Sequence, residues 1–135
     1  TLWHVMEHLE HLDETWECLR GLLSDRGVLI VAVPNCSSYD AGKYGEYWAA
    51  YDVPRHLWHF TPVTIQQLAS KHGFIMAARH PMPFDAFYVS MLSEKHRGSS
   101  CSFLKGMYAG TLAWFSTLGR KERSSSMIYV FRKKR

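Results

Sequence analysis

Few cysteines and no long apolar run narrow the classes of protein that this sequence can encode. The 135 residues contain three cysteines, Cys18, Cys36 and Cys101, which lie far apart and form no C-x-x-C pair. An odd number of scattered cysteines is typical of reduced thiols and excludes a disulfide framework. No apolar run reaches the roughly 18 to 20 residues of a membrane-spanning helix, and no secretory leader pattern is present. We therefore predict a cytoplasmic protein without stable membrane insertion.

The sequence also lacks a general excess of positively or negatively charged residues. The formal net charge is +4, but four of the 16 basic residues are the last four, Arg132, Lys133, Lys134 and Arg135, and the rest of the chain is neutral. A nucleic-acid groove needs basic residues gathered on one face, whereas solvation alone explains a basic terminus. With 47% apolar and 21% charged residues, the composition is that of one globular domain. We predict no nucleic-acid partner.

What the sequence does contain is an alternation of helix and strand patterns. Asp13 is placed to cap a helix whose apolar residues recur at helical spacing. The continuous apolar run VLIVAV, residues 28–33, predicts a buried central strand of a parallel sheet. Residues 36–60 then predict a long irregular loop, and loops of that length usually carry function.

The second half of the chain continues the alternation. In order, it predicts a helix begun by Thr61 and Pro62 and ended by Gly73, a strand over residues 74–80, two apolar helices over residues 84–92 and 103–118, and a strand over residues 127–133. Gly106 and Gly110 are expected to weaken the second apolar helix. With only three strands, and no partner before the first, the pattern is typical of the second half of a doubly wound α/β fold.

Several motifs in a fixed order carry a family resemblance. They are HVMEHL, LLSDRGVLIVAVPN, W-x-x-Y-D-V-P-R-H-L-W-H-F-T-P and a helix ending in HGF. Together they resemble the C-terminal half of class I S-adenosylmethionine-dependent methyltransferases, with the ubiquinone-type O-methyltransferases as the most similar group. The resemblance implies an α/β, truncated Rossmann-like methyltransferase fold of about three strands with flanking helices. Residues 1–135 would form a single partial domain, with residues 81–120 as a helical insertion or cap.

The resemblance also implies an activity. The intact protein would use S-adenosylmethionine to methylate a small-molecule acceptor. The family's glycine-rich turn is missing, because no G-x-G occurs in the chain, and so is the acidic residue that holds the ribose. Such a turn brings backbone amides close to the cofactor. Thr1 would fall at the end of the family's fourth strand, so we expect residues 1–135 to be inactive on their own.

Candidate binding residues lie in two short segments, one at the start of the sequence and one at the end of the first long predicted strand. The resemblance places Leu2, Trp3 and His4 beside the methionine end of the cofactor. Pro34 and Asn35 follow a strand at its carboxyl end, where open α/β sheets bind ligands. We therefore predict that Pro34 and Asn35 contact the substrate, with a plain strand-ending turn as the alternative.

The segment RHLWHF supplies the candidate catalytic residues, His56 and His59. A neutral histidine near its unperturbed pKa can remove a proton from a methyl acceptor. Asp52 would orient the base or contact the substrate, and Arg55 would anchor an anionic substrate group. The alternative is structural: an aromatic loop that folds over the sheet, with its histidines bonded to the backbone.

The opening segment also matches H-x-x-E-H through His4, Glu7 and His8. On an α-helix this pattern places two histidines on one face for zinc, with the glutamate as base, as in a zinc peptidase. Some ubiquinone-type relatives instead hold a divalent cation with Glu-x-x-Glu-His at this place, but here His4 replaces the first glutamate. We predict no metal site and keep the peptidase only as an alternative.

A further alternative is a non-catalytic dimerisation or binding module built on half of the methyltransferase fold. A truncated sheet leaves an exposed edge, and pairing of that edge in a homodimer would cover it. The apolar helices over residues 84–92 and 103–118 offer a second surface for such a contact, so both routes predict self-association. A substrate cap and a membrane-surface contact are the alternatives for these helices, and the sequence disfavours the membrane because no basic polar face is evident.

Overall fold

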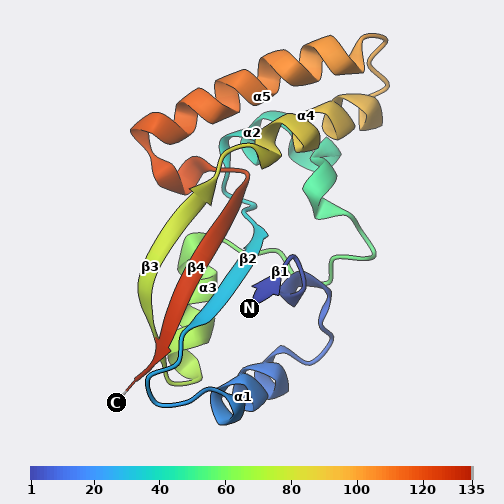
Figure 1. Ribbon diagram of the computed structural model, residues 1–135. Helices are drawn as coiled ribbons and strands as arrows, with labels where there is room; N and C mark the ends of the chain where they lie inside the picture. The colour runs from blue at the N-terminus through green and yellow to red at the C-terminus, as the bar shows by residue number, and fades with distance from the viewer. Residues whose placement is uncertain (135) are drawn as a thin grey trace.

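A four-stranded mixed sheet forms the centre of the fold (Figure 1). The computed structural model describes residues 1–134. The strands are β1 (Leu2–Trp3), β2 (Leu29–Pro34), β3 (Phe74–Met82) and β4 (Ser126–Lys133), arranged in the order β1-β2-β4-β3. β2 is parallel to β1 and antiparallel to β4. The α/β prediction is confirmed, but the expected three strands and parallel sheet are corrected, because residues 2–3 add a strand and β4 runs against β2.

Two helices cover one face of the sheet. These are α1 (Leu12–Leu22) and α3 (Pro62–Lys71). Trp16 of α1 and Ile65 of α3 are fully buried against Val31 and Phe131 of the sheet. The Thr61 Oγ1 accepts a hydrogen bond from the Thr64 amide at 3.1 Å, which completes the predicted start of α3. Burial of these large apolar side chains is the main stabilising contribution on this face.

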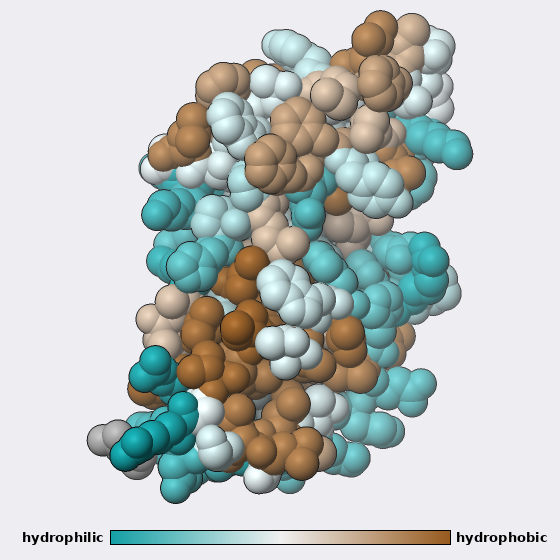
Figure 2. Space-filling view, in the orientation of Figure 1, coloured by the Kyte–Doolittle hydropathy of each residue, from teal (hydrophilic) through white to brown (hydrophobic). Residues whose placement is uncertain are grey.

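The other face of the sheet is apolar but only partly covered. Side chains alternate along a strand, so Ile128 and Val130 point away from the core formed with α1 and α3. Across the β2–β4 pair they lie opposite Ala32 and Ile30. Figure 2 shows a broad apolar area over the strands on the side toward the viewer. This face has the composition of a surface that packs against further protein.

The start of α1 differs from the prediction. The helix begins at Leu12 after His11, and the Asp13 side chain makes no cap hydrogen bond. Its carboxylate instead accepts hydrogen bonds from the Lys71 Nζ at 2.8 Å and from His72 at 2.7 Å. Asp13 therefore ties α1 to the end of α3, a contact between residues that lie far apart in the sequence.

Residues 36–60 are more ordered than the irregular loop that was predicted. They contain α2 (Tyr39–Tyr44) and two 3-10 turns, Gly45–Tyr47 and Ala49–Tyr51. Ser38 caps α2 through the Ala41 amide, and the buried Trp48 Nε1 donates to the Asp40 carboxylate at 2.8 Å. These local hydrogen bonds turn the segment into a compact unit beside the sheet.

Two packed helices form one end of the molecule. They are α4 (Asp85–His96) and α5 (Ser102–Gly119), and Figure 1 shows α5 lying across the end of the fold farthest from α1. The sequence predicts that Gly106 and Gly110 weaken α5, but this does not explain why glycines stand at these positions. Both are buried where α5 meets α4. Within residues 1–134, no helix combines the length and apolar character needed to cross a membrane.

The strand β3 extends beyond its predicted end at residue 80. It continues through Pro81 to Met82, where Pro81 lies opposite Met127 of β4. Proline has no N–H to donate to a neighbouring strand. β3 is an edge strand, so no second strand beside it needs that hydrogen bond. This extension carries the chain directly to α4, which lines the candidate site.

Candidate functional site

A cavity of about 570 Å³ opens at the carboxyl end of β2, and we call it the His56 cavity. Residues from separate parts of the chain line it: the turn after β1, the end of β2, residues 49–56, α4 and the start of β4. Its polar lining consists of His4, Asp52, Arg55, His56, Asp85, His96 and Ser126. Five predicted site residues therefore meet in one cavity: His4, Pro34, Asp52, Arg55 and His56.

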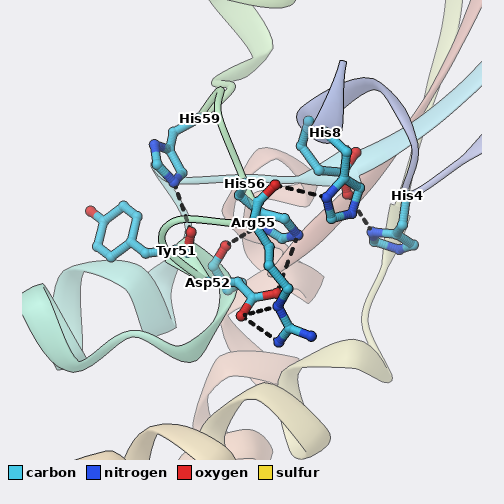
Figure 3. A network of polar contacts seen from close by, with 9 residues as sticks. His4, His8, Tyr51, Asp52, Arg55, His56 and His59 are labelled. Atoms are coloured by element: carbon cyan, nitrogen blue, oxygen red, sulfur yellow. Dashed lines mark hydrogen bonds and ion pairs between the residues drawn. The ribbon is translucent and has the colours of Figure 1, made fainter. Parts of the chain in front are cut away.

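His56 presents one ring nitrogen toward the groups around the cavity. Its Nδ1 lies 2.8 Å from the Ala50 carbonyl oxygen, and its side chain is 11% exposed (Figure 3). A carbonyl only accepts, so Nδ1 carries the proton in the neutral ring. The Nε2 then has a free lone pair, 3.9 Å from the Asp52 carboxylate. The ring is held in the tautomer that can accept a proton at Nε2.

Asp52 and Arg55 form an ion pair at the edge of the cavity. The Arg55 Nη2 donates to the Asp52 Oδ1 at 2.6 Å and the Nε donates to the same oxygen at 3.2 Å. Asp52 ends a 3-10 turn with a φ of 41°, in the left-handed region. That conformation turns the chain back so that the Arg55 and His56 amides donate to the Asp52 carbonyl.

His4 lies between two carboxylates. Its Nδ1 is 3.3 Å from a Glu7 oxygen and its Nε2 is 3.6 Å from an Asp85 oxygen. These contacts, with Asp85 the stronger, raise the pKa of His4 to about 9. Burial acts to raise the pKa of Asp85, but hydrogen bonds from His4 and Ser126 outweigh it and the pKa is lowered. At neutral pH His4 is therefore a cation and Asp85 an anion.

We expect the stability of the fold to fall between about pH 6.5 and pH 9 as His4 loses its proton. The folded-state pKa lies above the unfolded one, so the stabilisation is complete below about 6.5 and is lost as the pH rises through 9. Histidine NMR titration measures the His4 pKa directly. Asp85→Asn should lower that pKa, whereas Asp13→Asn, which removes a distant exposed carboxylate, should leave it unchanged. A wild-type His4 pKa near 6.5 would contradict the assigned ion pairs.

Glu7, His8 and His56 bring three potential metal ligands together. One ligand atom from each lies within 4.8 Å of the other two. His8 Nδ1 is 2.9 Å from the Arg55 carbonyl oxygen, which only accepts hydrogen bonds, so Nδ1 carries the proton in the neutral ring. The lone pair of the His8 Nε2 is then available to a ligand. Glu7 is 1% exposed, and its Oε2 has no hydrogen-bond partner among the residues that the structure describes. These three side chains have the donor atoms to hold a cation. The set differs from the H-x-x-E-H motif, because His56 supplies the ligand that the motif assigns to His4.

The H-x-x-E-H interpretation is wrong. Residues Met6–His8 form a short 3-10 helix, and His4 precedes it with a φ of 49°. The two histidines therefore do not share one face of an α-helix, as a zinc peptidase of this type requires. His4 is paired with Asp85, and His8 with the backbone of Arg55.

Comparison with known proteins agrees with the fold. A family model described as "Methyltransferase domain" matches residues 1–78. The chain belongs to the methyltransferase domain family. No curated protein matches the sequence of this methyltransferase domain significantly.

Solved structures of methyltransferases share the fold of this domain. One is a candidate sarcosine dimethylglycine methyltransferase from Galdieria sulphuraria, with TM-score 0.54 and 16% identity, covering 98% of this chain and 51% of its own. Another is the cyclopropane synthase MmaA2 from Mycobacterium tuberculosis, with TM-score 0.54 and 14% identity, covering 97% and 53%. The methyltransferase domain thus spans about half the length of these two proteins. Their likeness confirms the Rossmann-like fold, while the ubiquinone-type subgroup stays a prediction.

A third solved structure contains the methyl donor. Phosphoethanolamine N-methyltransferase 2 from Haemonchus contortus, in complex with S-adenosyl-L-methionine, has TM-score 0.50 and 15% identity. The match covers 98% of this chain and 32% of that protein. The methyltransferase domain therefore corresponds to about a third of this larger protein.

Asn35 of the methyltransferase domain is not available to a substrate. The side chain is fully buried, and its Nδ2 donates to the carbonyl oxygens of Glu122 at 2.7 Å and Ser124 at 2.9 Å. Its Oδ1 accepts from the amide and the hydroxyl of Ser37. The amide is thus fully used to join the end of β2 to the turn before β4, which corrects the predicted substrate contact.

Three other predicted residues lie outside the His56 cavity. His59 Nε2 is 3.0 Å from the Tyr51 carbonyl oxygen, and the two rings contact edge to face. Leu2 and Trp3 form β1, where they pair with Val31 and Ala32 of β2. None of the three lines the cavity, and their predicted catalytic and cofactor contacts stay predictions.

The sequence interpretation expected a helical insertion or cap over residues 81–120 but named no site residue in α4. Asp85 and Tyr88 lie on its first turn and His96 at its end, and all three line the cavity. One signal was present in the sequence: Asp85 is the only charged residue between positions 81 and 93. A lone carboxylate in an apolar run is a candidate functional residue, because burial without a partner is unfavourable.

Proposed function

We propose that the protein containing this domain transfers a methyl group from S-adenosylmethionine to a small-molecule acceptor that enters the His56 cavity. One observation carries the proposal: residues chosen from separate motifs, His4, Asp52, Arg55 and His56, line a single cavity at the carboxyl end of β2. Ligands of open α/β sheets bind at that edge. The family match over residues 1–78 supports the reaction class.

The residues of this chain suit one end of the methyl donor. The cavity combines apolar residues such as Val89 and Leu92 with the carboxylates of Asp52 and Asp85, a setting compatible with a cationic sulfonium. S-adenosylmethionine supplies a methyl group on a sulfonium that is already a good leaving group. The chain contains no G-x-G turn for the remainder of the cofactor. We therefore assign these residues to the reacting end and the acceptor side.

Each polar residue has a role that follows from its charge. His56 accepts the proton of the acceptor at Nε2, since its Nδ1 proton is held by the Ala50 carbonyl. Arg55 binds an anionic group of the acceptor, because its guanidinium lies at the exposed rim and makes contact with only one oxygen of Asp52. His4 cannot serve as the base at neutral pH, since it is already protonated. It holds Asp85 in place through their ion pair.

Calorimetry with S-adenosylhomocysteine tests the assignment of the cofactor site. We expect no micromolar binding by residues 1–135 alone and clear binding by the full-length protein. The partly exposed Ile128 and Val130 on the partly covered sheet face support a requirement for further protein. Micromolar binding by the 135 residues would contradict the proposal, because the main cofactor contacts would then lie within this chain.

Chelation distinguishes a proton acceptor from a metal ligand at His56. If Nε2 accepts a proton, EDTA treatment of the full-length enzyme followed by dialysis should leave the initial rate within about twofold of the untreated rate. Loss of activity that Mg²⁺, Mn²⁺ or Zn²⁺ restores would instead assign Glu7, His8 and His56 to a cation. Glu7→Gln is the matching variant, since it removes a ligand but leaves His56 in place.

Location and self-association complete the proposal. The thiols of Cys18, Cys36 and Cys101 are all free, which supports the cytoplasmic prediction.

A homodimer through the edge of β2 is the alternative non-catalytic function, since β1 covers only two residues of that edge. Sedimentation velocity of the full-length protein tests it, and a monomer at high concentration would exclude it.

A further inference from the structure

The outer face of α5 carries exposed apolar side chains near both ends of the helix. Small residues on the opposite face, Gly106 and Gly110 among them, pack on α4. Residues on the outer face are large and apolar, with exposed fractions between 56% and 68%: Phe103, Leu104, Tyr108, Phe115 and Leu118. A surface helix normally carries polar side chains on its outer face. Large exposed apolar side chains gathered on one helix at the end of the molecule indicate a binding surface.

The charged residues within α5 and at its C-terminal end are mostly basic. Residues 106–119 contain no Asp, Glu, Lys or Arg, and the only charged residue in the helix is Lys105. Arg120 and Lys121 follow the helix directly. Beyond its C-terminal end lies an open groove of about 1050 Å³ lined by Arg79, Arg120, Lys121 and Arg123, where the one acidic residue, Glu122, is paired with Arg79.

We propose that α5 binds the surface of a membrane that contains anionic phospholipids. Phe103, Leu104 and Phe115 would enter the boundary between head groups and acyl chains, while the basic groove takes up the lipid phosphates. Tyr108 suits this boundary because its ring is apolar and its hydroxyl polar. The helix would lie in the plane of the interface without crossing the bilayer.

The charge distribution favours lipid over a second copy of the chain. In a symmetric dimer of antiparallel α5 helices, Lys105 of one copy would face the Arg120 and Lys121 end of the other. Like charges would then meet at both ends of the contact. An anionic lipid surface neutralises the same residues. This inference does not depend on the methyl-transfer proposal, because it rests on α5 and the basic groove alone.

Vesicle sedimentation with the full-length protein tests the proposal in the absence of any cofactor. The probes are phosphatidylcholine vesicles and vesicles with about 30% phosphatidylglycerol. We expect at least tenfold stronger binding to the anionic vesicles, falling with added salt. The double variant Leu104→Gln/Phe115→Gln should reduce that binding at least tenfold. Arg120→Gln/Lys121→Gln should remove the preference for phosphatidylglycerol.

A matched control uses exposed apolar residues elsewhere on the surface. Leu22 on α1 and Ile75 on β3 are 79% and 48% exposed, so Leu22→Gln/Ile75→Gln changes apolar exposure without touching α5. This control should bind vesicles as the wild type does, and circular dichroism should show that each variant folds. Equal loss in both double variants, or absence of vesicle binding, would overturn the proposal. So would a dimer in sedimentation that Leu104→Gln/Phe115→Gln dissociates.

Discussion

Replacing His56 with glutamine is expected to lower the kcat of the full-length methyltransferase by about 10²- to 10⁴-fold, the range typical for removal of a general base. Glutamine retains a polar side chain but cannot take up the acceptor's proton. In the structure the Nε2 of His56 is the unprotonated ring nitrogen, because the Ala50 carbonyl holds the proton on Nδ1. Initial rates at saturating methyl donor and acceptor measure the effect.

His59→Gln is the matched control for this prediction. His59 lies three residues away in the same segment, but its ring is hydrogen-bonded to the Tyr51 carbonyl oxygen and lies outside the cavity. We expect its kcat to change by less than about threefold. Calorimetry with S-adenosylhomocysteine should give similar affinities for both variants, which would show that the fold is retained. A larger loss for His59→Gln than for His56→Gln would reverse the assignment of the proton acceptor.

Elements with a strong local pattern were predictable from the sequence. The apolar run of β2 and the Thr61–Pro62 start of α3 appear as expected, because strand burial and helix capping are encoded by adjacent residues. β1 is only two residues long and exists through its pairing with Val31 and Ala32. No local pattern encodes such a strand. In residues 36–60, the short helices depend on the Ser38 cap and on the Trp48 contact with Asp40, which a propensity argument does not contain.

The candidate site was predictable where a motif lies close to the chemistry. Asp52, Arg55 and His56 belong to one turn, so their convergence follows from a single segment. Asn35 was misassigned because its partners, Glu122 and Ser124, lie 87 and 89 residues away. A strand-ending asparagine looks the same in sequence whether its amide is free or fully bonded. Only the contact with the turn before β4 decides between the two.

A second large effect is expected from Gly106→Ala in α5. A Cβ at position 106 would lie 2.5 Å from the Met91 Cα and 2.8 Å from its amide nitrogen. These are backbone atoms, so no side-chain rotation relieves the clash, and α5 must move away from α4. Overpacking of this kind costs about 1–3 kcal/mol, which exceeds the gain of up to ~1 kcal/mol from placing alanine in a helix.

Gly110→Ala should act through the same interface. Its Cβ would lie 2.8 Å from the Phe87 Cα, again a backbone atom. In the double variant Gly106→Ala/Gly110→Ala, the loss of stability should be smaller than the sum of the single losses. Once α5 has moved outward to accept one methyl group, part of the clash at the other position is already relieved.

Urea unfolding measures these changes, and Gly119→Ala is the control within the same helix. Position 119 is the last residue of α5 and has no heavy atom within 4 Å of an added Cβ. We expect this variant to match or slightly exceed the wild-type midpoint, whereas Gly106→Ala should lower it at an unchanged m-value. If Gly106→Ala were as stable as Gly119→Ala, the close approach of α4 and α5 at Met91 would be refuted. The two glycines would then weaken α5 only through helix propensity, as the sequence alone predicts.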